Sequence, residues 1–166
     1  MPAELLTRER ADELVALPKR IADPREFAWK GQVLPSDAKA KRYRDVVVAP
    51  LFIQFRLVSV ETRDRFSISG YTNSDFAYTL IYQTGDALRR IDSGFRHMYE
   101  DPDNGRRIVL EGPHLHVFVE GRDLQVAEAV EWYGFGDPQS AFTAFLDYCN
   151  VVDRPWGQKA MKFHDR

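Results

Sequence analysis

The feature that most constrains this chain is a series of short β-type segments, separated by turn residues, that begins at Val46. β-Branched and aromatic side chains are concentrated in these segments, which is typical of strands. Residues 51–58 alternate in character, and Pro50 marks a strand start or a bulge. Turn residues at 62–64, 71–75 and 84–86 then lead into further strands expected at 65–70, 76–83 and 87–91. Short strands joined by tight turns predict an antiparallel meander.

The strongest turn signal in the chain is the sequence Asp101-Pro102-Asp103-Asn104-Gly105. Proline presets φ at an early turn position, and Asn-Gly tolerates positive φ. This turn predicts that residues 95–99 pair with residues 106–110. A further strand is expected from His114 to Glu120, and residues 124–132 fit either a strand or a short helix.

Helical patterns stand near the two ends of the chain. The first runs from Thr7, a suitable N-cap, to Leu17 before Pro18. The second has Asp137 as N-cap and Pro138 at its first position, followed by apolar residues at 142, 145, 146 and 149. The predicted fold class is therefore α+β: an antiparallel β-meander sheet packed against an N-terminal and a C-terminal helix. Residues 27–44 are expected to form loops or short strands, and residues 153–166 a weakly structured tail.

Size and composition narrow the class of protein. A chain of 166 residues with 44% hydrophobic content is expected to fold as a single domain, residues 1–166. The single cysteine, Cys149, excludes an internal disulfide, and its place on the apolar helix stripe predicts core packing. The net charge of −2 gives no general attraction to nucleic acid. Without an apolar run of membrane-spanning length or a signal peptide, we expect a cytoplasmic protein with no membrane partner.

The strand that begins at His114 carries the clearest candidate for chemistry. Successive strand side chains point to opposite faces, so His114 and His116 should share one face while Leu115 and Val117 face the core. The two imidazoles then meet solvent or a ligand about 7 Å apart. Imidazoles exchange protons near neutral pH and also bind transition metals.

His97 precedes the Asp101–Gly105 turn, so the predicted hairpin allows it to approach His114 and His116. Three converging histidines would make a catalytic or metal-binding group. The alternative is that these are ordinary strand histidines with hydrogen-bonded rings, and the sequence leaves both interpretations open.

Arginines cluster in the same part of the sequence. Arg89, Arg96 and Arg107 are the candidates for binding a phosphate, if they line the face that carries the histidines. The basic run Lys39–Arg44, interrupted by Tyr43, combines positive charge with a ring that can stack on a base. The alternative is a solvated basic surface balanced by nearby carboxylates.

The chain as a whole resembles a family of short bacterial or phage proteins known only as a domain of unknown function. The resemblance lies in the segments RERADELVALPKRI, RHMYEDPDNGRRIVLEGPHLHVFVEG and FTAFLDYCNVVDRP, and GPHLHVF and FLDYCNV are its most specific parts. It implies a bacterial or phage origin and brings no established activity. Small proteins of this type are met among mobile elements and toxin–antitoxin or defence loci.

Our first functional hypothesis is a toxin-like RNA-processing enzyme that uses no metal or other cofactor. His116 and His97 would act as base and acid, and His114 would orient them. Arg89, Arg96 and Arg107 would hold the phosphate of the RNA.

Two alternatives belong to other classes. One is a non-enzymatic adaptor or inhibitor that binds a protein partner, encoded nearby, through the aromatic residues of the meander, Tyr71, Phe76, Tyr78 and Tyr82. The other is a metal site at the three histidines, completed by Glu120 or Glu111.

Overall fold

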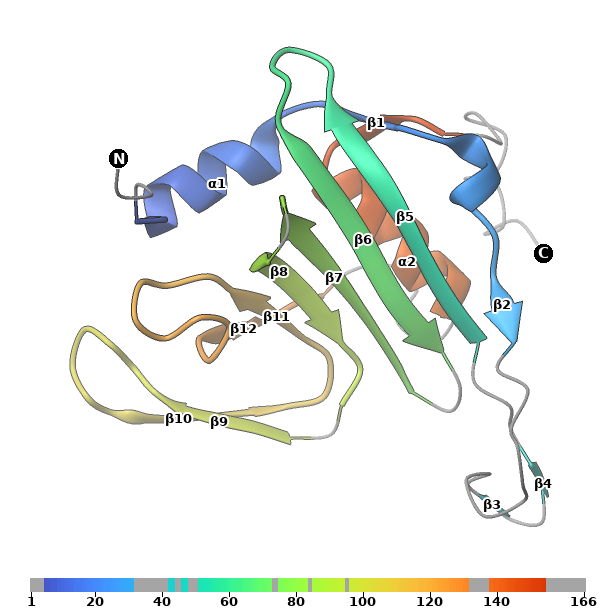
Figure 1. Ribbon diagram of the computed structural model, residues 1–166. Helices are drawn as coiled ribbons and strands as arrows, with labels where there is room; N and C mark the ends of the chain where they lie inside the picture. Colours follow the sequence, from blue (N-terminus) through green and yellow to red (C-terminus); the bar gives the residue numbers. More distant parts are fainter. Residues whose placement is uncertain are drawn as a thin grey trace.

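The computed structural model describes residues 5–31, 42–43, 46–47, 51–72, 75–83, 85–94, 96–131 and 138–154. The fold is α+β, with a mostly antiparallel sheet, one N-terminal helix and one C-terminal helix, as the sequence predicted (Figure 1). The helical elements are α1 (Arg8–Ala16), the 3₁₀ turn η1 (Pro24–Glu26) and α2 (Pro138–Tyr148). The strands are β1 (Lys19–Ile21), β2 (Lys30–Gly31), β3 (Arg42–Tyr43), β4 (Val46–Val47), β5 (Leu51–Ser59), β6 (Arg65–Thr72), β7 (Phe76–Tyr82), β8 (Asp86–Asp92), β9 (Arg96–Glu100), β10 (Arg107–Glu111), β11 (His114–Val117), β12 (Ala127–Ala129) and β13 (Val151–Asp153).

The main sheet has the strand order β12-β11-β8-β7-β6-β5-β1-β13, and β2 also pairs with β5. Strands β5 to β8 follow one another as antiparallel neighbours, which confirms the predicted meander. The β9–β10 pair forms a separate two-stranded sheet, and so does the β3–β4 pair. The chain therefore leaves the main sheet after β8, makes the β9–β10 hairpin and returns to pair β11 with β8 (Figure 1).

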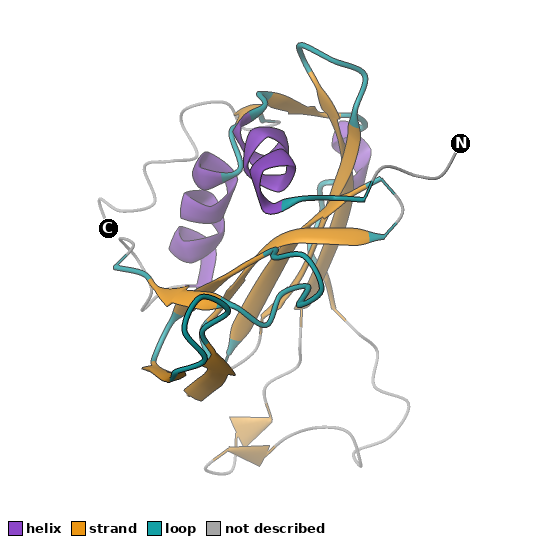
Figure 2. Ribbon diagram, turned by 90° about the vertical axis from the view of Figure 1, so that its left-hand side faces the viewer, coloured by secondary structure: helices purple, strands orange, loops and turns teal. Residues whose placement is uncertain are grey.

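Both helices cover the same face of the main sheet (Figure 2). Phe55, Ile68 and Leu80 stand in register on three adjacent strands and are fully buried. From α2, Phe142 and Phe145 pack onto this face. Buried apolar side chains on one face of the sheet explain why the helices adhere to it.

Tyr78 of β7 links the sheet to the beginning of α2. Its ring lies over Gly70 of β6, where a Cβ atom would stand 2.5 Å from a ring carbon. Its hydroxyl donates to the carbonyl of Pro138 at 2.7 Å. Any residue larger than glycine at position 70 would displace the ring.

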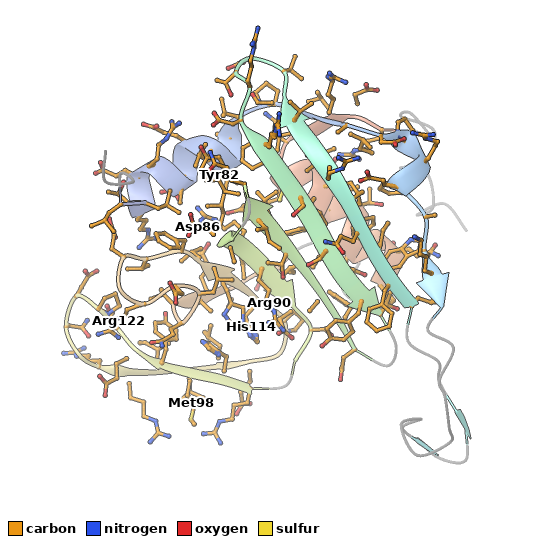
Figure 3. All side chains as sticks on the ribbon, in the orientation of Figure 1. Tyr82, Asp86, Arg90, Met98, His114 and Arg122 are labelled. Carbon is orange, nitrogen blue, oxygen red and sulfur yellow. The ribbon has the colours of Figure 1, made fainter. Side chains whose placement is uncertain are left out.

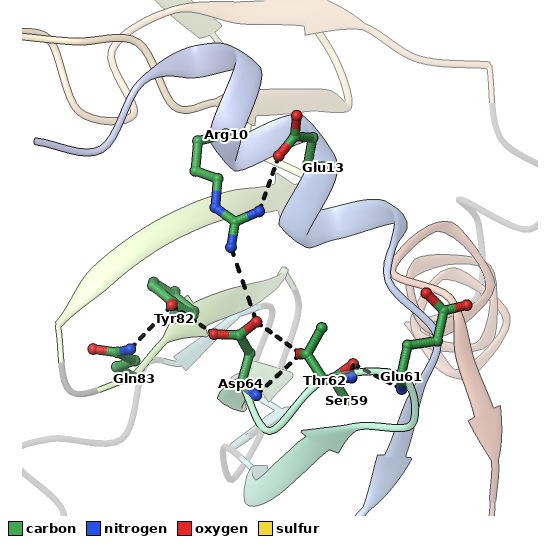
Figure 4. Close-up of polar contacts among 8 residues, drawn as sticks. All are labelled: Arg10, Glu13, Ser59, Glu61, Thr62, Asp64, Tyr82 and Gln83. Carbon is green, nitrogen blue, oxygen red and sulfur yellow. Dashed lines mark hydrogen bonds and ion pairs between the residues drawn. The ribbon is translucent and has the colours of Figure 1, made fainter. Parts of the chain in front are cut away.

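Asp64, in the turn between β5 and β6, anchors α1 to the sheet (Figure 4). Its carboxylate accepts hydrogen bonds from Thr62 at 2.7 Å and from Tyr82 at 2.8 Å. Arg10 of α1 lies 4.0 Å from the same carboxylate and also pairs with Glu13. The predicted N-cap is confirmed as well, because the Thr7 hydroxyl accepts from the backbone N–H of Arg10.

Lys19 is a fully buried lysine at the start of β1. Its Nζ donates to the carbonyls of Val15 at 2.8 Å, Leu17 at 2.8 Å and Cys149 at 2.9 Å. These carbonyls belong to the C-terminal ends of α1 and α2, which carry the negative end of each helix dipole. One ammonium group thus joins both helices to the edge of the sheet.

Three sequence predictions are corrected or completed by the fold. The strand from His114 ends at Val117 rather than at Glu120, because Val119 and Asp123 pair across a tight turn. Residues 127–129 form a strand, which decides between strand and helix for that segment. Residues 151–153 also form a strand, parallel to β1, where a tail was expected to begin. Asp137, residues 155–166 and residues 39–41 of the basic run lie outside the described residues.

Neither described α-helix has the length and apolar character that a membrane crossing needs.

We expect replacement of Lys19 by methionine to lower the free energy of unfolding by about 3 kcal/mol, because a buried polar group without a partner costs about 1–3 kcal/mol. Urea denaturation followed by circular dichroism measures this difference. Lys30→Met on exposed β2 is the control and should change stability by less than about 0.5 kcal/mol. Equal stability of the two variants would show that the three carbonyls do not depend on Lys19.

Candidate functional site

The β9–β10 hairpin brings His97 against the two histidines of β11. The His97 ring stacks on His114 with centroids 5.2 Å apart and meets His116 edge-on at 4.6 Å. The His114 and His116 rings lie 4.7 Å apart. One ring nitrogen from each histidine lies within 4.8 Å of the other two. The three histidines therefore converge, as the first and third hypotheses require.

The two strand histidines are more buried than the alternation of β11 predicted. His114 is 3% exposed and His116 is 8% exposed, while His97 is half-buried. The sequence indicated a face that can meet solvent or a ligand, and exposure to solvent is excluded because His97 and its hairpin cover that face. Access to the group is therefore limited, and its imidazoles lie in a poorly hydrated place.

Each imidazole forms a hydrogen bond to a backbone carbonyl. His114 and His116 use Nδ1, toward Gly112 at 2.9 Å and Leu124 at 2.7 Å. His97 uses Nε2, toward Gln125 at 2.6 Å. A carbonyl oxygen only accepts, so each of these ring nitrogens must carry the hydrogen. In the neutral ring, Nδ1 of His97 and Nε2 of His114 and His116 then keep a lone pair.

The proton affinity of His116 is strongly lowered by its surroundings. Burial lowers the pKa of His116 to about 4, and the hydrogen bond to Leu124 acts against this effect. Electrostatic interactions with His114, His97 and Arg90 lower the pKa of His116 further. His116 is therefore a neutral imidazole at neutral pH.

Arg89 does not belong to the histidine face. It pairs in register with Val117 and Leu80, on the face that packs against the helices. Its guanidinium is buried and donates to Tyr148 of α2, to the Leu88 carbonyl and to Asp12 of α1. Arg89 therefore joins both helices to β8, and it cannot reach a phosphate at the histidines from there.

Arg96 and Arg107 also lie away from the histidine group. His97 points inward from β9, so its neighbour Arg96 is exposed on the outer face of the hairpin. Arg107 is exposed on the same outer face, where it reaches the sulfur of Met98 at 2.9 Å. Figure 3 shows Met98 on the outer side of the hairpin, directed away from His114.

Arg90 is the arginine that stands beside the histidines. It pairs in register with His116, and Asp92 pairs with His114, so all four residues share one face (Figure 3). Arg90 Nη2 binds Asp92 at 3.0 Å, while its buried Nε has no hydrogen-bond partner. Arg90 and Asp92 were not selected as site residues from the sequence, although strand alternation combined with the β8–β11 pairing would have identified them.

The carboxylates proposed to complete a metal site lie elsewhere. Glu120 accepts a hydrogen bond from the backbone N–H of Arg8, at the start of α1, at 3.0 Å. Glu111 is exposed on the outer face of the hairpin, opposite Arg96. Among the described residues, the group of possible metal ligands here consists of the three histidines alone.

The aromatic surface of the adaptor hypothesis does not form as expected. Phe76 and Tyr78 are buried in the core, and Tyr82 is half-buried against Asp64. Only Tyr71, which is 36% exposed, lies open among the four aromatic residues proposed.

Cys149 packs in the core, as the helix pattern indicated. It is fully buried, and burial raises the pKa of its thiol to about 12. The thiol is therefore unreactive at neutral pH.

The neighbours Arg89 and Arg90 offer a matched pair of variants. We expect Arg89→Gln to cost about 2–3 kcal/mol of unfolding free energy, since it removes buried charged hydrogen bonds. Arg90→Gln should cost less than about 1 kcal/mol, as is usual for a partly exposed pair. In NMR spectra of the imidazole groups the order should reverse, because Arg90→Gln should shift the His116 signals more than Arg89→Gln does. If Arg89→Gln shifts these signals more strongly, the assignment of the two faces is wrong.

The burial of His116 predicts a pH-dependent contribution to stability. Its folded-state pKa of about 4 lies below the ordinary value of 6.5, so the contribution is complete above about pH 6.5 and lost as the pH falls through 4. A shift of this size is worth about 3 kcal/mol. Urea denaturation of chelator-treated protein across this window should show a steeper loss for wild type than for His116→Gln. Parallel curves for the two proteins would exclude His116 as the titrating group.

The comparisons with known proteins give a family and no relative of known function. No curated protein and no solved structure matches the chain. A family model matches residues 6–151, a range that includes the three histidines and all the candidate arginines. The chain therefore belongs to a family of unknown function (DUF6978).

Proposed function

We propose that His97, His114 and His116 bind one zinc ion and leave a coordination position open to water or substrate. The observation that carries the proposal is the convergence of three imidazoles, each with one nitrogen already committed to a backbone carbonyl. Zinc accepts neutral imidazole nitrogen as a ligand and commonly takes three histidines in catalytic sites.

The spacing of the ring nitrogens fits a site whose imidazole rings move closer together when a metal binds. Zinc–nitrogen bonds of about 2.0–2.1 Å in tetrahedral geometry place the ligand nitrogens about 3.4 Å apart. The three ring nitrogens here lie within 4.8 Å of one another. Rotation of the imidazole rings that moves the ligand nitrogens by about an ångström would bring them to the spacing that zinc needs.

The carbonyl partners support the same conclusion. Histidines that bind metal almost always donate their other N–H to a carbonyl, a carboxylate or water, which fixes the tautomer and the ring orientation. Gly112, Leu124 and Gln125 supply such carbonyls, one for each histidine. The lone pairs on the opposite nitrogens need no further proton loss before they bind a metal.

The absence of a fourth protein ligand among the described residues favours a catalytic rather than a structural metal. Structural zinc sites take four protein ligands, whereas catalytic sites take three and hold water in the fourth position. Zinc lowers the pKa of such a water to about 7, which makes hydroxide available at neutral pH. A zinc-dependent hydrolytic enzyme is therefore the function that this geometry supports best.

The metal-independent RNA-processing hypothesis has less support. It depended on Arg89, Arg96 and Arg107 to hold the phosphate, and these residues lie on other faces. It also required a histidine acid and a histidine base side by side in a buried group. Zinc instead needs neutral imidazole ligands, and burial keeps His116 neutral at neutral pH.

We expect protein produced without a histidine tag to bind one zinc ion per chain in elemental analysis and calorimetric titration. His114→Ala and His116→Ala should each weaken zinc binding by about a hundred-fold or more, because each removes one of three ligands. His97→Ala should do the same, and it tests whether the hairpin supplies the third ligand.

His164→Ala is the matched control, because it removes the one other histidine of the chain. It should leave zinc affinity and stoichiometry unchanged. Zinc binding that survives His114→Ala and His116→Ala, or that depends on His164, would overturn the proposal.

A further inference from the structure

A groove of about 630 Å³ lies on the same sheet face as the histidines, opposite the helices. It crosses β5, β6, β7 and β8 and is bordered by η1 and β2. Polar and aromatic side chains line it, among them Phe52, Gln54, Ser69, Tyr71, Thr79 and Arg90.

Strand register places the groove and the histidine group on the same face of the sheet, with the β9–β10 hairpin over the histidine end. One transverse row of paired residues consists of Gln54, Ser69, Thr79, Arg90 and His116. The adjacent row consists of Phe52, Tyr71, Ala77, Asp92 and His114. Neighbouring strands are about 4.8 Å apart, so each row extends about 19 Å from β5 to β11. An extended ligand lying along these rows would have one end at the histidines.

The far end of the groove carries two aromatic rings. Phe52 and Tyr71 are cross-strand partners, and they are 40% and 36% exposed. Two partly exposed aromatic rings side by side on a sheet face offer flat apolar surfaces on which another ring can stack. Bases of single-stranded nucleic acid stack on such rings, with about 1–3 kcal/mol for each base.

The charge of the groove suits a phosphate backbone. Three of the described lining residues are cations, Lys30, Arg56 and Arg90, and one is an acid, Glu26. Glu26 holds Arg56, whose side chain remains 68% exposed. Arg90 stands next to His116, and its side chain is 39% exposed. Arg90 on β8 therefore lies between the aromatic rings and the histidines, whereas Lys30 and Arg56 stand at the β5 end of the groove, beside the rings.

We infer that single-stranded nucleic acid binds across this sheet face. Its bases stack on Phe52 and Tyr71, and its phosphates meet Arg56 and Arg90. The hydroxyl and amide groups of Ser69, Thr79 and Gln54 give hydrogen bonds to the bases or sugars. The strand leads to the histidine group, where it places a phosphodiester. This last point rests on the proposed zinc site, whereas binding in the groove does not require the metal.

The test is fluorescence anisotropy with labelled oligouridine and oligothymidine, using zinc-loaded and chelator-treated protein. We expect both single strands to bind and the matching duplex to bind about ten-fold more weakly, because its bases are not available for stacking. Unlabelled uridine monophosphate should compete poorly. Affinity should fall with rising salt, as phosphate contacts require.

Matched variants separate the groove from the rest of the surface. Phe52→Leu combined with Tyr71→Leu should weaken binding at least about ten-fold while keeping both positions apolar. Arg90→Gln should weaken binding and reduce the salt dependence. Met98→Ala and Arg96→Gln, on the outer face of the hairpin, are the controls and should bind like wild type. Thermal unfolding of every variant confirms that it is folded.

The failure of this inference differs from the failure of the zinc proposal. Oligonucleotides that do not bind zinc-loaded protein, that bind equally as duplex, or that ignore the Phe52 and Tyr71 substitutions overturn the groove inference. Zinc uptake, measured in the same samples, tests the zinc proposal and does not decide whether the groove binds nucleic acid. Single-strand binding that survives in His114→Ala but is lost in the aromatic variant supports the groove, whether or not zinc binds.

Discussion

The rest of the structure depends on one constraint, which is that both α-helices cover one face of the main sheet and leave the other face only partly covered. Both helices pack on the same face, where Phe55, Ile68 and Leu80 stand in register. Lys19 and Arg89 hold these helices in place through hydrogen bonds to helix ends and side chains. Because all the described helical cover is on that side, the opposite face remains available for polar side chains and for the hairpin.

Alternation along the strands gives neighbouring residues unrelated roles. Arg89 is a structural residue that joins α1, α2 and β8, while Arg90, the next residue, stands beside His116. The same rule separates His97, which faces the histidine group, from Arg96, which faces solvent. The sheet face on which a residue lies therefore decides whether its substitution affects stability or the site. The distance of the residue from the histidines along the chain matters little.

The sequence predicted those parts of the fold that depend on local chemistry. The Asp101–Gly105 turn predicted the β9–β10 pairing, and the alternation of β11 correctly placed His114 and His116 on one face. It did not predict that the hairpin would leave the main sheet and cover this face, because that depends on contacts with Gln125 and Arg122, remote in sequence. The arginines were assigned by proximity along the chain, and tertiary pairing with β11 selects Arg90 instead. Buried Lys19 could not be identified, since its partners are backbone carbonyls.

The fold does not hold the three histidines of the site equally firmly. His114 and His116 stand on β11, which is paired on both sides within the main sheet. His97 stands on a separate two-stranded sheet, and its side-chain links to the body include its own bond to Gln125 and the bond from Arg122 to Glu100. Two ligands of the proposed metal site are therefore preorganised, and the third arrives with an element that opens at lower free energy than the sheet. A metal bound by all three histidines would tie the hairpin to β11, so metal affinity and closure of the site would be one equilibrium.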